Sequence, residues 1–274
     1  MAFFQSLFIL AKFKPQVVFS KGGYVSLPVT WAASLLRVPI VLHESDSRMG
    51  LANRMAAKLA KNVCVAFPEL QKKGKKYVFT GNPVRSEIFE GNSKEGYKIT
   101  GFNAKPPVLL IWGGSQGAQQ VNELLHTDLK KFTTHFQVIH ITGKGKGLQA
   151  PSSKLPAPKN YKSFEYVGED LKHLYAITDL VIGRAGANSL VEMAALQKPN
   201  ILIPLRNADQ LQNAASFQFH GASVLWKPGQ NLFDLTLNLW ENEAQKTKMK
   251  SALTKCFNPN AADQIASLIL KTKK

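Results

Sequence analysis

Three glycine-containing turns mark the places where the sequence can hold a charged ligand. They read "FSKGGYVSLP" (19–28), "LIWGGSQGAQ" (110–119) and "VIGRAGANSLVE" (181–192), and each follows an apolar run and precedes a helical pattern. A helix that begins at such a turn presents unpaired backbone N–H groups and the positive end of its dipole. That geometry suits a phosphate group. Close packing of helix against strand explains any single turn equally well, but three turns on one chain favour an anionic ligand.

Polar side chains accompany two of these turns. Ser115 and Gln116 add a hydroxyl and an amide to the second turn, where they can supplement the backbone donors against a diphosphate. Ser115 is equally suited to cap the following helix, and the two roles are compatible. Glu192 lies about one helical turn beyond the third glycine turn, where a carboxylate can accept the two hydroxyls of a ribose. The alternative for Glu192 is a solvated acid on a helix surface.

Several other kinds of site are disfavoured by the sequence. GxxxxGK[ST] is absent, which argues against a P-loop hydrolase, and "GGSQGA" does not match the GxGxxG of dinucleotide-binding proteins. There is no HExxH or CxxC motif. In "HESD" (43–46), Glu44 and Asp46 beside His43 are a weak metal signal compared with an oxygen-rich cage. We therefore predict no metal ion and no cofactor.

The elements that must position these turns follow an α/β pattern. Short β-branched runs alternate with longer helical stretches, which predicts βα units around mostly parallel sheets. Residues 90–106 are rich in Gly, Asn, Ser and Pro and are predicted to be a linker between domains at 1–89 and 107–257. The expected strands are 16–20, 39–43, 62–67, 77–80, 107–112, 136–142, 162–167, 179–183, 200–205 and 222–226. The expected helices are 1–13, 26–36, 51–60, 117–130, 169–177, 186–196, 209–220, 232–256 and 260–272.

Composition limits the partners and the compartment. The 274 residues include 35 Lys and Arg against 18 Asp and Glu, a formal net charge of +17 that favours an anionic partner. The lysine run at 72–76 has no interleaved aromatic residues, so we expect no nucleic acid partner. Cys64 and Cys256 are far apart, which indicates neither a disulfide framework nor a zinc site and fits a reducing cytoplasm. No apolar stretch approaches the roughly 20 residues that span a bilayer, and the first residues do not resemble a signal peptide.

A series of motifs resembles, in order, those of the MurG family of bacterial glycosyltransferases. This family moves N-acetylglucosamine from UDP-N-acetylglucosamine to lipid I, the undecaprenyl-pyrophosphoryl muramyl-pentapeptide, and so makes lipid II for peptidoglycan. The resemblance runs from about residue 14 to the C-terminus and is specific because several motifs occur together. The motifs are "GGYVSLP", "HESD", "GLANRMAAKLA", "AFPE", "TGNPVR", "GGSQGAQQVNE", "GRAGANSLVEMAALQKP" and "DQLQNA".

The resemblance implies a glycosyltransferase-B fold made of two Rossmann-like domains, with 258–274 as a C-terminal helix that returns to the first domain. It also implies a peripheral protein on the cytoplasmic face of the bacterial membrane. By their motifs, the resemblance implies that Ser115 contacts the diphosphate and that Arg85 lies in the donor cleft. The helix beneath the phosphates begins with Ala187, Asn188, Ser189, Leu190 and Val191. Glu192 is implied to bind the ribose, Gly168 to meet the uracil edge, and Gln212 to contact the sugar. Gln116 and Asp46 are expected beside them. Gly22, Gly23 and Tyr24 are expected on the acceptor side.

The chemistry of an inverting transfer requires a base and a site for negative charge. Helix N-termini together with Arg85 can stabilise the departing UDP without a divalent ion. A base must deprotonate the acceptor hydroxyl while it attacks from the face opposite the diphosphate. Glu44 is the residue that we assign to this role, with Asp46 and His43 as the other candidates.

This sequence departs from the family pattern at several positions. "HESD" stands where the family has "HEQN", so Asp46 replaces an asparagine, and an ionised carboxylate accepts hydrogen bonds but cannot donate them. Leu211 and Asn207 also differ from the residues usual in the family. The family's first glycine loop, GGTGGH, is missing together with the opening strands, so the first domain is expected to be incomplete at its N-terminus, with an exposed sheet edge.

The missing loop leaves alternatives open. A separate N-terminal subunit can supply it, or the chain is a truncated gene product or has a misassigned start. Two alternative functions follow: an inactive donor-binding subunit that needs such a partner, and a related transferase of another UDP-sugar. Anionic inner-leaflet lipid is a further expected partner because Lys and Arg gain about 1 kcal/mol each near such a surface. The helix at 2–13 either enters the headgroup layer or packs on the core.

Overall fold

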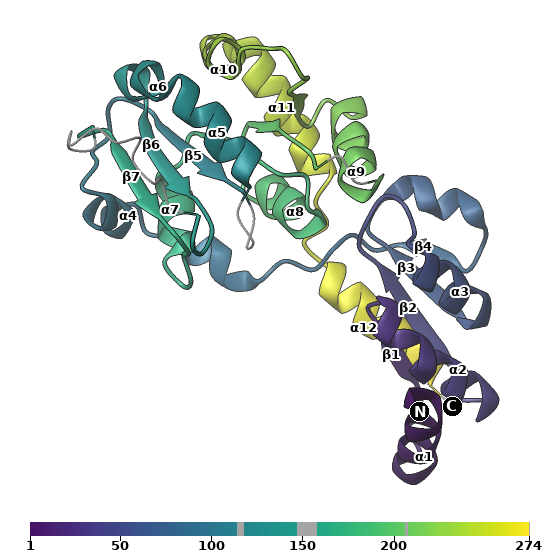
Figure 1. The fold of residues 1–274 in the computed structure, drawn as a ribbon. Coiled ribbons are helices and arrows are strands. Elements are labelled where there is room, and N and C mark those ends of the chain that lie inside the picture. Colours follow the sequence, from purple (N-terminus) through teal and green to yellow (C-terminus); the bar gives the residue numbers. More distant parts are fainter. Residues whose placement is uncertain (114–117, 147–157, 206–207, 274) are drawn as a thin grey trace. The chain divides into compact units, whose positions relative to one another are not determined.

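The computed structural model describes residues 1–113, 118–146, 158–205 and 208–273. The chain divides into two compact units. Unit 1 comprises residues 1–84 and 257–274, and unit 2 comprises residues 85–256 (Figure 1). Within the described ranges, no helix is long and apolar enough to cross a membrane.

Unit 1 is built on a four-stranded parallel sheet. The strands are β1 (Val18–Ser20), β2 (Ile40–Glu44), β3 (Asn62–Val65) and β4 (Tyr77–Phe79), and they lie side by side in sequence order. The helices of this unit are α1 (Ala2–Phe13), η1 (Tyr24–Ser26), α2 (Leu27–Leu35), α3 (Leu51–Leu59), η2 (Pro68–Lys73) and α12 (Ala261–Thr272). All four strands predicted in this part of the sequence are formed.

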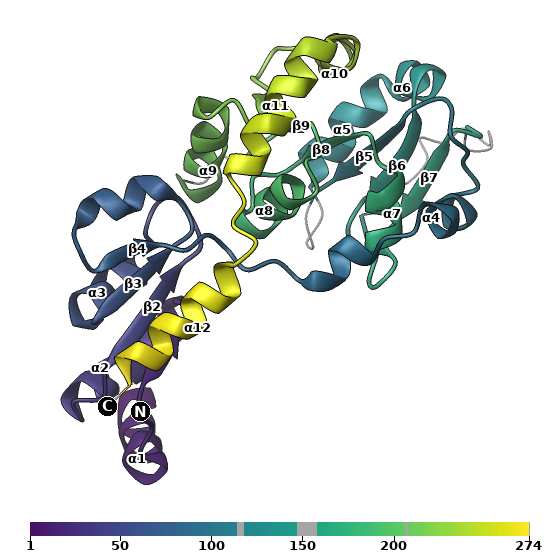
Figure 2. The same ribbon diagram turned by 180° about the vertical axis from the view of Figure 1, so that it is seen from behind.

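Both faces of this sheet are covered, which explains why β2 is buried along its whole length. Ile40 and Leu42 point into a core shared with α2 and α3. Val41, whose side chain points to the opposite face, packs with Cys64 against Ile265 of α12. Figure 2 shows α12 lying along this second face.

Polar contacts hold both ends of α12 in unit 1. Asn62 Nδ2 donates to Thr272 Oγ1 at 2.8 Å. Asn258 Nδ2, just before the helix, donates to the carbonyl of Thr80 at 2.8 Å. The last residues of the chain are therefore part of the same unit as the first strands.

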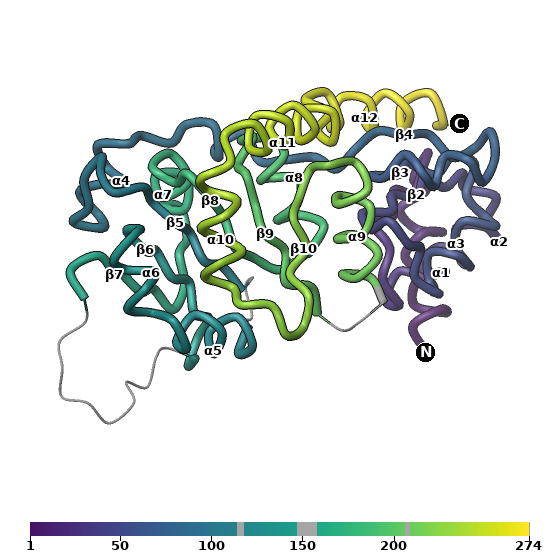
Figure 3. The backbone as a smooth tube through the Cα atoms, turned by 90° about the horizontal axis from the view of Figure 1, so that it is seen from above, coloured from purple at the N-terminus to yellow at the C-terminus, as the bar shows by residue number. Residues whose placement is uncertain are grey.

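Unit 2 contains a six-stranded sheet, all of it parallel. The strand order is β10-β9-β8-β5-β6-β7, as Figure 3 shows. Since β6 lies on one side of β5 and β8 on the other, the strand order reverses at β5. Parallel α/β sheets bind ligands at such a switch point, beyond the carboxyl ends of the strands. The strands are β5 (Val108–Trp112), β6 (Gln137–Ile141), β7 (Tyr161–Phe164), β8 (Leu180–Gly183), β9 (Asn200–Leu202) and β10 (Val224–Leu225).

The helices of unit 2 differ from the predicted ones at one junction. The expected continuous helix at 232–256 is two helices, because the Asn242 side chain accepts from Gln245 N and starts a new helix there. The helical elements of the unit are η3 (Ser86–Glu90), α4 (Ser93–Thr100), α5 (Gln119–Thr127), α6 (Leu129–His135), α7 (Leu171–Ile177), α8 (Ala187–Ala195), α9 (Ala208–Phe219), α10 (Leu232–Glu241) and α11 (Glu243–Lys255).

The predicted linker at 90–106 is instead a packed part of unit 2. It contains α4, which starts at an Asn92 cap and lies against α7. Gly91 and Gly96 bring the backbone so close to the carbonyls of Lys172 and His173 that a side chain would not fit. Helix α4 packs on α7 through glycines rather than through a row of apolar side chains. The sequence therefore shows only a weak helical hydrophobic period at these residues. The chain passes between units at Val84–Arg85 and Cys256–Phe257.

Candidate active site

The first glycine turn of unit 1 lies at the carboxyl end of β1. Gly22 and Gly23 have φ angles of 90° and 84°, in the region that favours glycine. The Gly22 backbone also lies directly against the Asn53 side chain, which leaves no space for a Cβ atom. Tyr24 follows with its side chain 82% exposed. The glycines of this turn, which is predicted to face the acceptor, are therefore required both by the positive φ angles and, at Gly22, by the contact with Asn53.

Glu44 ends β2 and is held from two directions. Its Oε1 accepts from the backbone N–H of Asp46 at 3.0 Å, and its Oε2 accepts from Asn53 Nδ2 at 2.8 Å. The residue is only 3% exposed. Burial raises the pKa of the Glu44 carboxyl above its ordinary value, and the two hydrogen bonds oppose that rise. A carboxylate with a raised pKa is a stronger base than an ordinary exposed one.

Sequence reasoning gave Asn53 no role of its own. It lies within the quoted "GLANRMAAKLA" motif, on the first turn of α3, and its amide orients Glu44. Its Oδ1 atom is buried and has no hydrogen-bond partner among the described residues. The Asn53 side chain therefore connects the glycine turn to the carboxylate of Glu44 at the end of β2.

His43 is fully buried beside Glu44, with both ring nitrogens engaged. Its Nε2 lies 3.1 Å from the carbonyl oxygen of Gly81, so Nε2 carries the hydrogen, because a carbonyl only accepts. Its Nδ1 faces Lys21 Nζ at 3.1 Å. Burial, followed by the charge of Lys21, lowers the pKa of His43 to about 4. A neutral imidazole with both nitrogens occupied is a poor base, so the geometry favours Glu44 over His43 for that role.

Two predicted residues of unit 2 cannot be placed, since Ser115 and Gln116 lie outside the described residues. The helix that follows their turn, α5, begins at Gln119. At its first turn, Gln120 Oε1 accepts from Arg184 Nη1 at 3.1 Å. This contact joins the segments that follow β5 and β8, the two strands at the switch point.

Arg184 anchors the third glycine turn and was not singled out by the sequence. It is buried, and its Nη1 also donates to the carbonyl of Ile203 at 2.8 Å. Asn213, on α9, donates to the carbonyl of Ala185 at 3.2 Å. The turn between β8 and α8 is thereby held by α5, by the segment that follows β9, and by α9.

The N-terminus of α8 has the geometry expected of an anion site. Its N-cap is Gly186, which has no side chain to satisfy the first N–H groups of the helix. Ala187 and Ser189 are half-buried and Asn188 is exposed. Leu190 and Val191 are in the core, so only the backbone of these two predicted residues is available to a ligand.

Glu192 is a buried acid, which excludes the alternative of a solvated helix surface. It is 7% exposed. Tyr175 OH donates to its Oε2 at 3.0 Å, and Arg85 Nη2 lies 3.5 Å from its Oε1. Burial and the neighbouring Glu192 raise the pKa of Tyr175, so its hydroxyl keeps the proton that it donates. Tyr175, on α7, is a further residue that sequence reasoning missed.

Two of the remaining donor-side predictions, Gly168 and Gln212, fall on exposed positions of unit 2. Gly168 lies between β7 and α7, with its carbonyl accepting from Leu171 N at 3.2 Å. Gln212 is exposed on α9, next to the exposed Leu211. Asn207 lies outside the described residues. Asp46, in unit 1, is half-buried.

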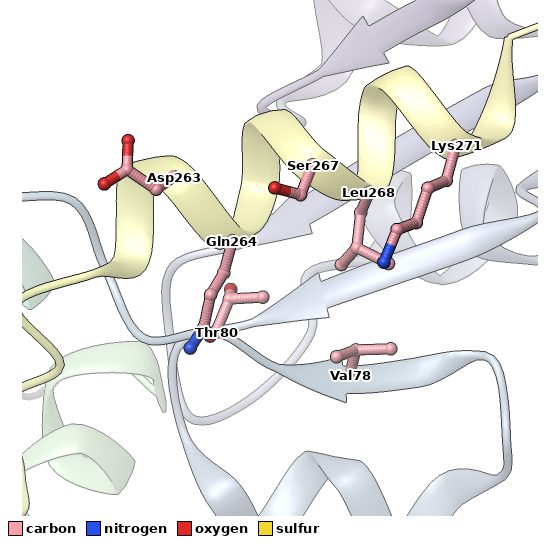
Figure 4. A pocket seen from close by; sticks show the side chains of 7 residues that line it. All are labelled: Val78, Thr80, Asp263, Gln264, Ser267, Leu268 and Lys271. Atoms are coloured by element: carbon pink, nitrogen blue, oxygen red, sulfur yellow. The ribbon is translucent and has the colours of Figure 1, made fainter.

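Neither a metal-binding cluster nor a detected pocket coincides with these residues in the described part of the chain. The described part of the chain holds no group of three His, Cys, Asp or Glu side chains that could bind a metal ion. A pocket of about 380 Å³ lies between β4 and α12 in unit 1 and contains none of the predicted site residues. Figure 4 shows its lining residues, Val78, Thr80, Asp263, Gln264, Ser267, Leu268 and Lys271.

Comparison with known proteins gives a consistent result along the chain. The glycosyltransferase family 28 N-terminal domain matches residues 1–65, and the glycosyltransferase family 28 C-terminal domain matches residues 108–265. A UDP-N-acetylglucosamine--N-acetylmuramyl-(pentapeptide) pyrophosphoryl-undecaprenol N-acetylglucosamine transferase of Clostridium botulinum is 43% identical, with 91% of this chain and 74% of the relative covered. The transferase of the same name from Lachnoclostridium phytofermentans is 42% identical, with 95% and 74% covered.

Solved structures agree with the sequence relatives. MurG of Acinetobacter baumannii superposes with a TM-score of 0.74 at 27% identity, covering 98% of this chain and 77% of that one. A UDP-GlcNAc 2-epimerase of Neisseria meningitidis, bound to UDP-GlcNAc, has a TM-score of 0.73 at 17% identity, covering 98% and 80%. The second likeness concerns the fold alone. With its two parallel α/β units of the glycosyltransferase-B type, the chain belongs to glycosyltransferase family 28 and, within it, to the MurG family of N-acetylglucosamine transferases.

Proposed function

We propose that the protein transfers N-acetylglucosamine from UDP-N-acetylglucosamine to lipid I and forms lipid II for peptidoglycan synthesis, with inversion and without a metal ion. The observation that carries this proposal is the arrangement at the switch point of unit 2. An uncapped helix N-terminus, that of α8, is followed on the same helix by a buried carboxylate, Glu192, which Tyr175 and Arg85 hold in place. The names of the relatives supply the donor and the acceptor.

On the donor side, each part of a UDP-sugar has a matching group in unit 2. The first N–H groups of α8, at Ala187, Asn188 and Ser189, bind the diphosphate, together with Ser115 and Gln116. The Glu192 carboxylate accepts the ribose hydroxyls, Gly168 meets the uracil edge and Gln212 contacts the sugar. Arg85 is 70% exposed at its side chain and stabilises the negative charge that develops on the departing UDP. Fixed dipoles and a guanidinium supply this charge stabilisation, so the step needs no divalent cation.

On the acceptor side, the reaction needs a base and a place for the lipid-linked sugar. The acceptor hydroxyl attacks the anomeric carbon from the face opposite the diphosphate, the bond from that carbon to UDP breaks, and the hydroxyl proton passes to Glu44. Gly22, Gly23 and Tyr24 line the acceptor side. Asp46, where the family has asparagine, contacts the donor sugar as an acceptor of hydrogen bonds only.

Release of UDP by the purified chain with lipid I tests this function. Turnover by the chain alone, with UDP-N-acetylglucosamine preferred to UDP-glucose, is the expected result. Turnover that appears only after addition of a second protein carrying a GGTGGH loop would favour the donor-binding subunit instead. Stronger thermal stabilisation by UDP-glucose would favour a transferase of another sugar.

We further propose that unit 1 binds the anionic inner leaflet of the bacterial membrane from the cytoplasmic face. Unit 1 carries fifteen Lys and Arg against four Asp and Glu, although it contains well under half of the chain. Its first helix, α1, exposes large apolar side chains beside Lys12 and Lys14. Those side chains are Phe4, Phe8, Ile9 and Phe13. Apolar side chains flanked by lysines are typical of a helix that lies in the headgroup layer.

Replacing two of these side chains should weaken membrane binding. Phe4 and Phe8 are 72% and 70% exposed. Insertion of a phenylalanine ring into the interface removes apolar area from water, so each change to serine should lower vesicle affinity by about tenfold. Sedimentation with phosphatidylglycerol-containing vesicles at low salt measures this. The control is Phe219→Ser, which removes an equally exposed ring (84%) from unit 2. An equal loss in the control, or none in α1, would contradict the membrane assignment.

A further inference from the structure

Lys21 is a residue of unit 1 to which the function above assigns no role. It lies between β1 and the Gly22–Gly23 turn. Its Nζ is 3.1 Å from His43 Nδ1 and 3.0 Å from Ser45 Oγ. Because Nε2 of the same histidine is engaged by the Gly81 carbonyl, Nδ1 is the accepting nitrogen and the lysine donates. One lysine and one histidine thus connect the loops that follow β1, β2 and β4.

The charged groups around Lys21 come from two segments. Burial lowers the pKa of Lys21, and the carboxylates of Glu44, in β2, and Asp46, in the loop after it, oppose that change. The neighbouring strand β3 contributes Cys64, the register partner of His43, and burial raises the pKa of that thiol to about 11. Cys64 is therefore neutral, and Lys21 supplies a positive charge that couples to His43, Glu44 and Asp46.

We propose that Lys21 is a positioning residue for the transfer reaction. Its ammonium fixes the neutral, Nε2-protonated form of His43 and connects the Ser45 turn to the glycine turn. In this way it keeps the Glu44 carboxylate ionised and in place. This inference rests on the proposed function, in which Glu44 is the base. Lys21 itself touches no reacting atom in this scheme.

The physical reason is that the coupling between charges is reciprocal. The Lys21 ammonium opposes protonation of His43, and the Glu44 and Asp46 carboxylates stabilise the ammonium. Removal of the ammonium makes it easier to add a proton to His43 and to Glu44. Protonation of Glu44 abolishes its action as a base, and protonation of His43 adds a positive charge where Nδ1 had accepted a hydrogen bond. Both changes shift the acidic limit of activity to higher pH.

The test compares Lys21→Met, which keeps the length of the side chain and removes its charge, with Lys21→Arg, which keeps the charge. The matched control is Lys61→Met, the same change at an exposed lysine of unit 1. The first readout is the NMR titration of the His43 ring, assigned among the six histidines with a His43→Gln sample. We expect the His43 pKa of the wild type, about 4, to rise by about one unit in Lys21→Met and to stay low in Lys21→Arg and Lys61→Met.

The second readout is the pH dependence of kcat for UDP release. In Lys21→Met, the acidic limit of kcat should lie about one pH unit higher than in the wild type, so that at a pH below both limits kcat falls by about tenfold relative to the wild type, whereas at pH 8 it is unchanged. Lys21→Arg should restore the wild-type limit. An unchanged His43 titration, or a kcat that falls equally at every pH, would overturn the proposal.

The two readouts separate this inference from the proposed function. Absence of turnover in the wild type would remove the function but leave the His43 titration as a test of Lys21. Thermal stabilisation by UDP, which depends on unit 2, shows whether each variant is folded. Should Lys21→Met fail to fold, Lys21→Arg and Lys21→Gln carry the same comparison of a charged with an uncharged side chain.

Discussion

Glu44→Gln should lower kcat for UDP release with lipid I by about 10²- to 10⁴-fold, the range typical for removal of a general base. The substitution keeps the volume of the side chain and removes its ability to take up a proton. It should also be tolerated by the fold. Asn53 Oδ1 is buried without a partner among the described residues, so rotation of the Asn53 amide lets this oxygen accept from the introduced NH2 group. The other oxygen still accepts from Asp46 N.

Steady-state kinetics with a circular dichroism melt distinguishes a lost base from a lost fold. The matched control is Glu69→Gln, the same change at an exposed acid of unit 1, for which kcat should remain at the wild-type value. The KM for UDP-N-acetylglucosamine should change little in Glu44→Gln, because the donor contacts that we assign lie mainly in unit 2. A kcat within threefold of the wild type would place the base elsewhere.

Glu192→Ala should weaken UDP binding by about 100-fold. Two hydrogen bonds from ribose hydroxyls to a carboxylate contribute roughly 3 kcal/mol in total, and their loss removes about two powers of ten in affinity. The substitution also leaves the buried Tyr175 hydroxyl without its acceptor, at a cost of about 1–3 kcal/mol in the free energy of unfolding. Isothermal titration calorimetry with UDP measures the affinity without any lipid acceptor, and a chemical denaturation series measures the stability.

Two further variants distinguish the effect of Glu192→Ala on UDP binding from its effect on stability. Tyr175→Phe removes only the hydroxyl that orients Glu192, so we expect UDP affinity to fall by a few-fold, as with other groups that orient a binding side chain. Glu123→Ala removes an exposed acid from α5 of the same unit and should leave UDP affinity unchanged. If Glu192→Ala binds UDP as the wild type does, the carboxylate is a structural ion pair with Arg85 and not part of the donor site.

The resemblance to a family reached the right function class because its motifs are turns, and turns are specified locally. Glycines such as Gly22 and Gly23, which adopt positive φ angles, indicate a turn directly by their residue type. The strand that precedes each turn is an apolar run of a few residues. The motifs therefore survive even though the relatives share fewer than half of their residues with this chain.

Secondary structure predicted from the hydrophobic pattern is wrong at two places, where a packing or capping contact decides the structure. The sequence predicts a linker where α4 lies, because the hydrophobic pattern of a helix is weak there. The packing of α4 on α7 depends instead on Gly91 and Gly96, which have no side chain to contribute to such a pattern. A single helix was expected at 232–256 because the apolar period continues across Asn242, whose capping side chain starts α11. In both cases a polar or very small residue decided the structure through its backbone contacts.

By itself, the sequence determined the alternation of strands and helices, the place of each glycine turn at a strand end, and the family, since these depend on residue types that are close together along the chain. Only the tertiary structure decided which partners meet each functional side chain. Glu192 meets Tyr175 from another helix and Arg85 from 107 residues away, and His43 meets Lys21 and the Gly81 carbonyl from two other loops. Such partners are selected by the packing of distant elements. Burial at these contacts sets the pKa values and the orientation on which the chemistry depends.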